Sequence, residues 1–234
     1  MKAIFYREIK AYFSTPVGYI FIGMFLAVSG YFFAASNLLP KLPDLGSVLS
    51  NMLMMFLFLI PVLTMRLLSE EKNSRTDQLL LTAPVSVRDI VLGKFFAATA
   101  IYLLTLGITL LYLLVIGIHG APSYGKIFCN YLGFVLIGFA FISVGLFISS
   151  LTQNQASAAI ATFASLLFLY AVEWVRGSVQ SKLILAIIDC LSITKWYNEF
   201  ELGVLSVPAV IYYISFTAVF LLCTIHAVDR RRWS

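Results

Sequence analysis

Six long apolar runs constrain the fold of this chain more than any other feature of its sequence. They are residues 17–35, 48–65, 95–118, 128–151, 156–174 and 207–228. Each is close to the roughly 20 residues that an α-helix needs to cross about 30 Å of hydrocarbon. Across the chain 61% of residues are hydrophobic and 12% are charged, and a core of this size cannot hide that much apolar surface from water. The sequence therefore predicts an all-α integral membrane protein with about six transmembrane helices.

The segments outside these runs fit a single membrane domain over residues 1–234. Residues 1–15 have the spacing of an amphipathic interfacial helix. Its apolar positions are Met1, Phe5, Ile9, Tyr12 and Phe13. The alternative is a plain extension of the first span, but Pro16 favours a break. Residues 66–94 are the longest polar stretch, and residues 175–206 contain an apolar run, 183–188, that is too short to span and indicates an interfacial or re-entrant helix.

Positive charge predicts how the chain is inserted. Lys and Arg concentrate in the short cytoplasmic loops of membrane proteins. With the N-terminus inside, eleven of the 16 Lys and Arg residues fall on the cytoplasmic side and five fall outside. We therefore expect both termini and residues 66–94 to be cytoplasmic, and we attribute the net charge of +5 to topology rather than to nucleic-acid binding.

Catalytic and metal-binding patterns are missing from the sequence. A zinc protease needs two histidines on one helical face, whereas His119 and His226 are far apart. Residues 120–126 fit G-x-x-x-x-G-K, but Ile127 stands where Ser or Thr would bind Mg²⁺, and an apolar run precedes them instead of a strand. The span interiors also have almost none of the ionisable residues that a self-driven pump needs. We expect no cofactor or metal in this chain and an energy source outside it.

The three cysteines do not have metal-like spacing. Cys223 lies inside an apolar run, so we expect it to be a small buried hydrophobic residue. Cys129 and Cys190 are expected on the same outer side, which leaves a disulfide between them open.

Two segments have the residues expected of contact surfaces. In residues 66–94, charged residues flank the triplet at 79–81, and Pro84 is expected to end a short helix there. Leucines exposed between two spans favour a partner surface, although they could also rest on the lipid interface. In the fifth span Ser157, Ala161 and Ser165 recur at every fourth position, which lets another helix approach within one subunit or across a dimer.

The polar segment resembles the coupling region of type-two ABC exporter permeases. The matching residues are Glu70, Glu71, Lys72, Thr76, Leu79, Leu80, Pro84, Gly93 and Lys94. Arg75 and Gln78 depart from that pattern, in which a glycine and an acidic residue are usual. Further matches touch the whole chain, at residues 6–8, 149–152, 200–204 and 229–233, and at Gln155. The resemblance is greatest to gliding-motility-type and to sodium-exporter or copper-maturation permeases.

The resemblance implies a permease subunit of an exporter in a prokaryotic plasma membrane. Its expected partners are two copies of a cytoplasmic ABC ATPase, which would hold ATP and Mg²⁺, and a second permease that is the same chain or a homologue. The resemblance is also compatible with a large extracytoplasmic auxiliary subunit. The residues that it implies for ATPase coupling are Glu70, Glu71, Arg75, Thr76, Gln78, Leu79, Leu80, Pro84, Gln153 and Gln155. A non-transporting membrane scaffold or assembly factor, and an intramembrane enzyme, remain as alternatives, and the substrate is not indicated.

Overall fold

The fold is a bundle of membrane-spanning helices. The computed structural model describes residues 1–40, 45–73, 85–119, 123–176, 188–189 and 192–232. All regular elements among these residues are helices, and six are long and apolar enough to cross a membrane. They are Pro16–Leu38, Gly46–Asn73, Val87–Ile118, Tyr124–Leu151, Gln155–Trp174 and Val207–Arg230. The prediction of an all-α multi-pass membrane protein is confirmed.

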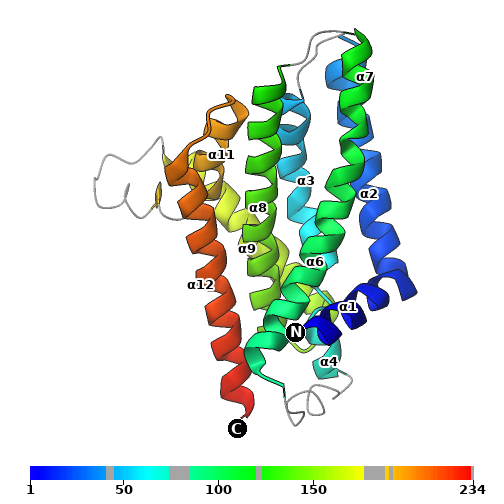
Figure 1. The fold of residues 1–234 in the computed structure, drawn as a ribbon. Coiled ribbons are helices and arrows are strands. Elements are labelled where there is room, and N and C mark those ends of the chain that lie inside the picture. The colour runs from blue at the N-terminus through cyan, green and yellow to red at the C-terminus, as the bar shows by residue number, and fades with distance from the viewer. Residues whose placement is uncertain (41–44, 74–84, 120–122, 177–187, 190–191, 233–234) are drawn as a thin grey trace.

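In Figure 1 the spans run roughly upright, from the lower end of the bundle to the upper end. The spans are built from α2 (Pro16–Phe33) with the π-helical η1 (Ala34–Leu38), α3 (Gly46–Thr64), α6 (Val87–Thr109), α7 (Leu111–His119), α8 (Tyr124–Leu151), α9 (Gln155–Arg176) and α12 (Val207–Arg232). Helices α1 (Lys2–Ser14) and α4 (Ser69–Asn73) lie at the lower end in Figure 1, together with both chain termini. We call this the terminal end. The short helix α11 (Ile193–Glu201) lies toward the opposite end.

Helix α1 lies across the terminal end and is separate from the first span, as predicted. Thr15 is extended, with φ −118° and ψ 157°, and Pro16 then takes the first position of α2, where a missing N–H costs nothing. The buried face of α1 packs against α6. It consists of Ile4, Glu8 and Tyr12. This face shares only Tyr12 with the predicted apolar face, and it includes a charged residue that the sequence pattern did not indicate.

The third span begins earlier than predicted. Ser86 caps α6, because its Oγ accepts a hydrogen bond from the Asp89 N–H at 3.1 Å and donates to Asp89 Oδ2 at 2.8 Å. Residues 87–94, which we assigned to the polar coupling segment, are therefore the first turns of the span. Lys94 belongs to this helix and its side chain is only 1% exposed.

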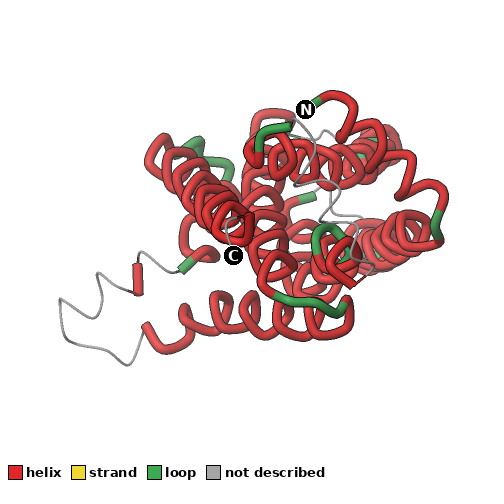
Figure 2. Tube along the Cα trace, turned by 90° about the horizontal axis from the view of Figure 1, so that it is seen from below, coloured by secondary structure: helices red, strands yellow, loops and turns green. Residues whose placement is uncertain are grey.

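Helix α8 is the centre of the bundle and packs against α3, α6, α9, α11 and α12. In an 18-residue stretch of α8, 72% of the residues are buried, against 22% in the corresponding stretches of α9 and α12, which fits a helix that is apolar all round. Its contact with α3 needs a glycine, because a Cβ at Gly145 would lie 2.7 Å from the Cβ of the fully buried Thr64. Helix α9 runs obliquely across the other spans (Figures 1 and 2), so most of its surface faces away from this core.

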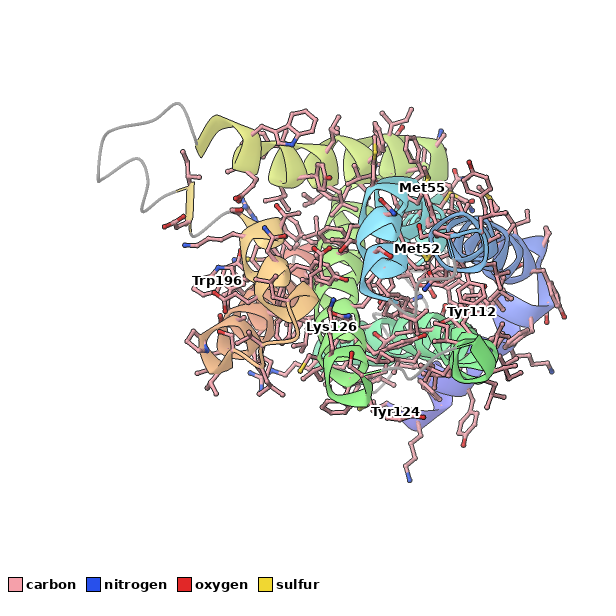
Figure 3. The ribbon with its side chains drawn as sticks, turned by 90° about the horizontal axis from the view of Figure 1, so that it is seen from above. Met52, Met55, Tyr112, Tyr124, Lys126 and Trp196 are labelled. Atoms are coloured by element: carbon pink, nitrogen blue, oxygen red, sulfur yellow. The ribbon has the colours of Figure 1, made fainter. Side chains whose placement is uncertain are left out.

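The connection between the fifth and sixth spans contains α11, which packs on α8 through Ile193, Tyr197 and Phe200. Seen from this end, Figure 3 shows α11, which contains Trp196, beside the first turns of α8, which contain Lys126. Gly203, with φ +83°, follows the last turn of α11, and the Val204 N–H returns to the Glu199 carbonyl at 3.0 Å. The helix expected at residues 183–188 lies almost entirely outside the described residues, and the pattern did not single out α11.

Two cysteines have positions that the structure describes. Cys129 is a buried free thiol, whereas its proposed partner Cys190 lies outside the described residues. Cys223 is exposed, so the prediction that it is buried was wrong. One face of α12 packs on α8 and α6 and the opposite face points outward, and Cys223 is exposed at the edge between them, where it lines a groove beside α8. The apolar composition of the run did not distinguish these faces, because the outward face of a span is apolar as well.

Candidate functional site

Four charged side chains meet at the terminal end, where α1, α4 and α6 converge. Lys94 Nζ lies 2.9 Å from Glu8 Oε1 and 3.0 Å from Glu71 Oε1. The Arg7 guanidinium lies 3.0 Å from Glu8 Oε1 and also contacts the Glu71 carboxylate. We call Arg7, Glu8, Glu71 and Lys94 the charge cluster. It joins three segments that are far apart in the sequence.

The charge cluster is largely shielded from water. The Lys94 side chain is 1% exposed, those of Glu8 and Glu71 are 11% and 15% exposed, and that of Arg7 is half exposed. Two cations face two carboxylates, which is what makes burial tolerable, because a buried charge without a partner is strongly unfavourable. Burial by itself would raise the pKa of Glu8, but the charge of Lys94 and hydrogen bonds from Lys94 and Arg7 outweigh it. They lower the pKa of Glu8 below its usual value, so that it stays a carboxylate at neutral pH.

This lowered pKa predicts a loss of stability in acid. Glu8 contributes fully to the free energy of unfolding above the pKa that it has in the unfolded chain, about 4.3 for a glutamate. This contribution is lost as the pH falls through the lower pKa that Glu8 has in the folded protein. We expect the thermal unfolding midpoint of the protein in detergent to fall between about pH 7 and about pH 3, and to fall less in Glu8→Gln. Asp229→Asn, which alters an exposed carboxylate, should keep the native pH dependence. A native pH dependence in Glu8→Gln would contradict the assignment.

A second set of contacts joins α1 to the end of the second span. Arg66 Nε lies 3.1 Å from Glu70 Oε2, and the same guanidinium donates to Thr15 Oγ1 and lies 5.6 Å from the centre of the Tyr12 ring. The Tyr12 hydroxyl donates to the Leu63 carbonyl at 2.7 Å. Burial raises the pKa of Tyr12, so this hydroxyl remains a donor. The two helices therefore meet through buried polar contacts as well as apolar ones.

The C-terminal end of α8 holds the other side of α4. Ser149 Oγ accepts hydrogen bonds from the backbone N–H groups of Leu68 and Ser69, at 3.0 and 3.1 Å. Lys72 Nζ donates to the Thr152 carbonyl at 3.0 Å, where a cation also meets the negative end of the α8 dipole. The start of the connection between the second and third spans is thus fixed to α1, α6 and α8 together.

The structure describes four of the ten residues that we assigned to coupling. Glu70 and Glu71 lie in α4 and take part in the contacts above. Gln153 and Gln155 lie at the turn between α8 and α9, which α4 also contacts. The other six lie outside the described residues: Arg75, Thr76, Gln78, Leu79, Leu80 and Pro84. A coupling role for any of them remains a prediction.

The small residues of α9 lie beside its packed face. Ser157 is exposed and Ala161 and Ser165 are half-buried. The residues of α9 that are buried within the subunit are Ala158, Thr162, Leu166 and Leu169. The small row therefore forms the edge of the internal contact, and its use across a dimer remains a prediction.

Three residues of the charge cluster, Arg7, Glu8 and Lys94, were not predicted as site residues. Glu8 and Lys94 belong to stretches that match the exporter permeases, but no sequence pattern joins residues 8 and 94. One signal was present, because Glu8 falls at helical spacing between Ile4 and Tyr12. A carboxylate on a face that also has two large apolar side chains indicates a buried cation as its partner.

Residues that could bind a metal do not cluster in the described part of the chain, where no group of three His, Cys, Asp or Glu residues could hold an ion. Lys126, from the phosphate-loop lookalike, lies in the first turn of α8 at the opposite end from the charge cluster. Residues 120–122 of that lookalike lie outside the described residues.

The sequence of this chain matches one known protein family. The sequence model of the family described as "ABC-2 family transporter protein" matches residues 6–187, which is more than half of the chain. This range includes five of the six spans and the whole charge cluster. A comparison with curated proteins finds no match. The chain belongs to the ABC-2 family of transporter proteins, as a permease that crosses the membrane several times.

Proposed function

We propose that this permease is the membrane subunit of an exporter that a separate cytoplasmic ABC ATPase drives through residues 66–86. The charge cluster is the observation that supports this most strongly. It ties α4, the first element of that connection, to α1 and α6 by buried ion pairs. Movement of α4 would therefore reach both helices directly.

The contacts of α4 suggest how force would travel. A push on residues 74–84 would reach α4 and pass through Glu71 to Lys94 in α6 and to Arg7 in α1. It would also reach α8 through Ser149. Because charged hydrogen bonds are short and directional, α4 would move with these helices as one body. ATP binding to the ATPase would then bias the bundle between two arrangements, as in other rigid-body transitions.

The partners follow from the same proposal. ATP and Mg²⁺ would bind to two ATPase copies, and a second permease, identical or homologous, would complete the path. The exposed surface of α9, with Ser157 at its edge, would suit contact with that second permease. The terminal end would face the cytoplasm of a prokaryotic cell. We assign no substrate, and membership of the gliding-motility-type group remains part of the proposal.

The orientation can be tested by cysteine labelling in intact cells. In a background without the three native cysteines, a cysteine at Asn73, which is exposed at the end of α4, should react with a membrane-impermeant maleimide only after the cells are opened. A cysteine at Tyr124, which is 72% exposed at the start of α8, should react in intact cells. The reverse pattern would contradict a cytoplasmic terminal end and remove the docking surface from the reach of an ATPase.

A further inference from the structure

A groove of about 750 Å³ lies between α8 and α12, near the end of the sixth span. Its lining side chains come from two helical faces that run side by side (Figure 1). They are Phe147 and Leu151 of α8, and Leu222, Cys223, His226, Ala227 and Arg230 of α12. Apart from Cys223, these side chains are either carbon-rich or basic, and none is acidic. The groove therefore offers an apolar surface next to positive charge.

The order of these residues along α12 gives the groove a direction. Leu222 and Cys223 come first, His226 and Ala227 follow one turn later, and Arg230 is last. From Leu222 to Arg230 the helix rises about 12 Å. The apolar part therefore lies deeper in the span, and the basic part lies at the terminal end, where α12 leaves the membrane.

The side chain of Arg230 is exposed beside this groove. No ion pair or hydrogen bond joins its exposed side chain to the described part of the chain. Its neighbour Asp229 does not line the groove. Attraction to the negative end of the α12 dipole accounts for a basic residue at this position, but it does not account for the apolar groove beside it.

We infer that the groove binds one anionic phospholipid from the membrane leaflet at the terminal end. An acyl chain would lie against Phe147, Leu151 and Leu222, and the phosphate would meet the Arg230 guanidinium, with an N–H of His226 as a second donor. Guanidinium groups bind phosphate oxygens in pairs, and basic pockets between spans are a known form of lipid recognition. A protein partner fits less well, because the apolar part of the groove opens within the length of the span, toward lipid.

Native mass spectrometry of the purified permease tests this directly. With phosphatidylglycerol and phosphatidylcholine of identical acyl chains added in equal amounts, phosphatidylglycerol adducts should predominate. Arg230→Gln should reduce this preference about fivefold, the effect expected of one basic residue at a membrane surface. Arg88→Gln removes an exposed cation near the start of α6 at the same end that does not line the groove, and it should leave the preference unchanged.

Cys223 provides a second measurement at the groove itself. In a variant with Cys129→Ser and Cys190→Ser, phosphatidylglycerol should slow maleimide labelling of Cys223 more than phosphatidylcholine does, and Arg230→Gln should remove the difference. The proposal would be overturned if the protein retained the two lipids equally in the mass spectra and both protected Cys223 equally from labelling. A loss of lipid preference in Arg88→Gln as large as in Arg230→Gln would also overturn it. Protection by an added protein but by neither lipid would also overturn it.

Discussion

Replacing Lys94 with methionine is expected to destabilise this permease more than any other single change in the charge cluster. The ammonium group is 1% exposed and lies within 3.0 Å of both Glu8 and Glu71. Without it two shielded carboxylates face each other, and the half-exposed Arg7 is the one cation left in the cluster. Removing one partner of a buried pair costs about 3–5 kcal/mol. We expect a loss of about 3 kcal/mol in the free energy of unfolding, since Arg7 offsets part of the charge.

A double-mutant cycle separates the ion pair from general damage to the fold. Unfolding in mixed detergent would be measured for Lys94→Met, Glu8→Gln and the double variant. The double variant should lose less stability than the sum of the two single variants, because each partner is costly mainly when the other remains. Arg88→Met removes an exposed cation from the same helix and should change stability by about 0.5 kcal/mol or less. Equal losses in Lys94→Met and Arg88→Met would contradict the burial of this pair.

Leu80→Asp is expected to have the largest effect on recovery of the partner ATPase. The reason comes from the sequence, in which Leu80 is the centre of an apolar triplet between charged residues. A residue at the centre of a protein interface typically contributes 2 kcal/mol or more, which is roughly thirtyfold in binding. The measurement is copurification of the ATPase with the variant permease. Leu202→Asp, an exposed leucine at the opposite end of the bundle, is the matched control and should leave recovery unchanged.

Membrane insertion of Leu80→Asp must be checked first, by the labelling of a cysteine at Asn73. If insertion is normal and both ATPase recovery and stimulated hydrolysis are unchanged, the ATPase docks elsewhere. The turn at residues 152–155 would then be the next candidate, because α4 lies against α8 and α9 there. A permease that never copurifies with an ATPase would favour the scaffold alternative.

The sequence predicted the spans well because lipid imposes a simple rule. Each run had to be apolar over a length fixed by the bilayer, and this signal is local. The start of the third span was missed because a local N-cap begins the helix before the apolar run begins. Ser86 and Asp89 begin α6 within a polar stretch, so that Lys94 becomes part of a helix. Polar residues in the first turns of a span are easily mistaken for a loop.

The charge cluster could be predicted only in part. Glu71 stood in a stretch that resembles a coupling region, but its partners lie on α1 and α6, far away in the sequence. Their meeting depends on how α1 lies across the bundle, which no local pattern specifies. The exposure of Cys223 was missed for a related reason, since hydrophobicity does not tell an inward face from a lipid-facing one.

The most direct test of the account separates ATPase binding from ATPase stimulation. Permease and ATPase would be reconstituted together, and both the binding affinity and the rate of ATP hydrolysis would be measured with native permease, Glu71→Gln and Asp229→Asn. If Glu71 passes the movement of α4 to α1 and α6, Glu71→Gln should bind the ATPase within about threefold of native affinity, because its carboxylate contacts Lys94 and Arg7 within the permease. It should nevertheless lose most of the stimulation. Asp229→Asn should match the native permease in both. Full stimulation by Glu71→Gln would contradict the claim that the charge cluster carries the coupling.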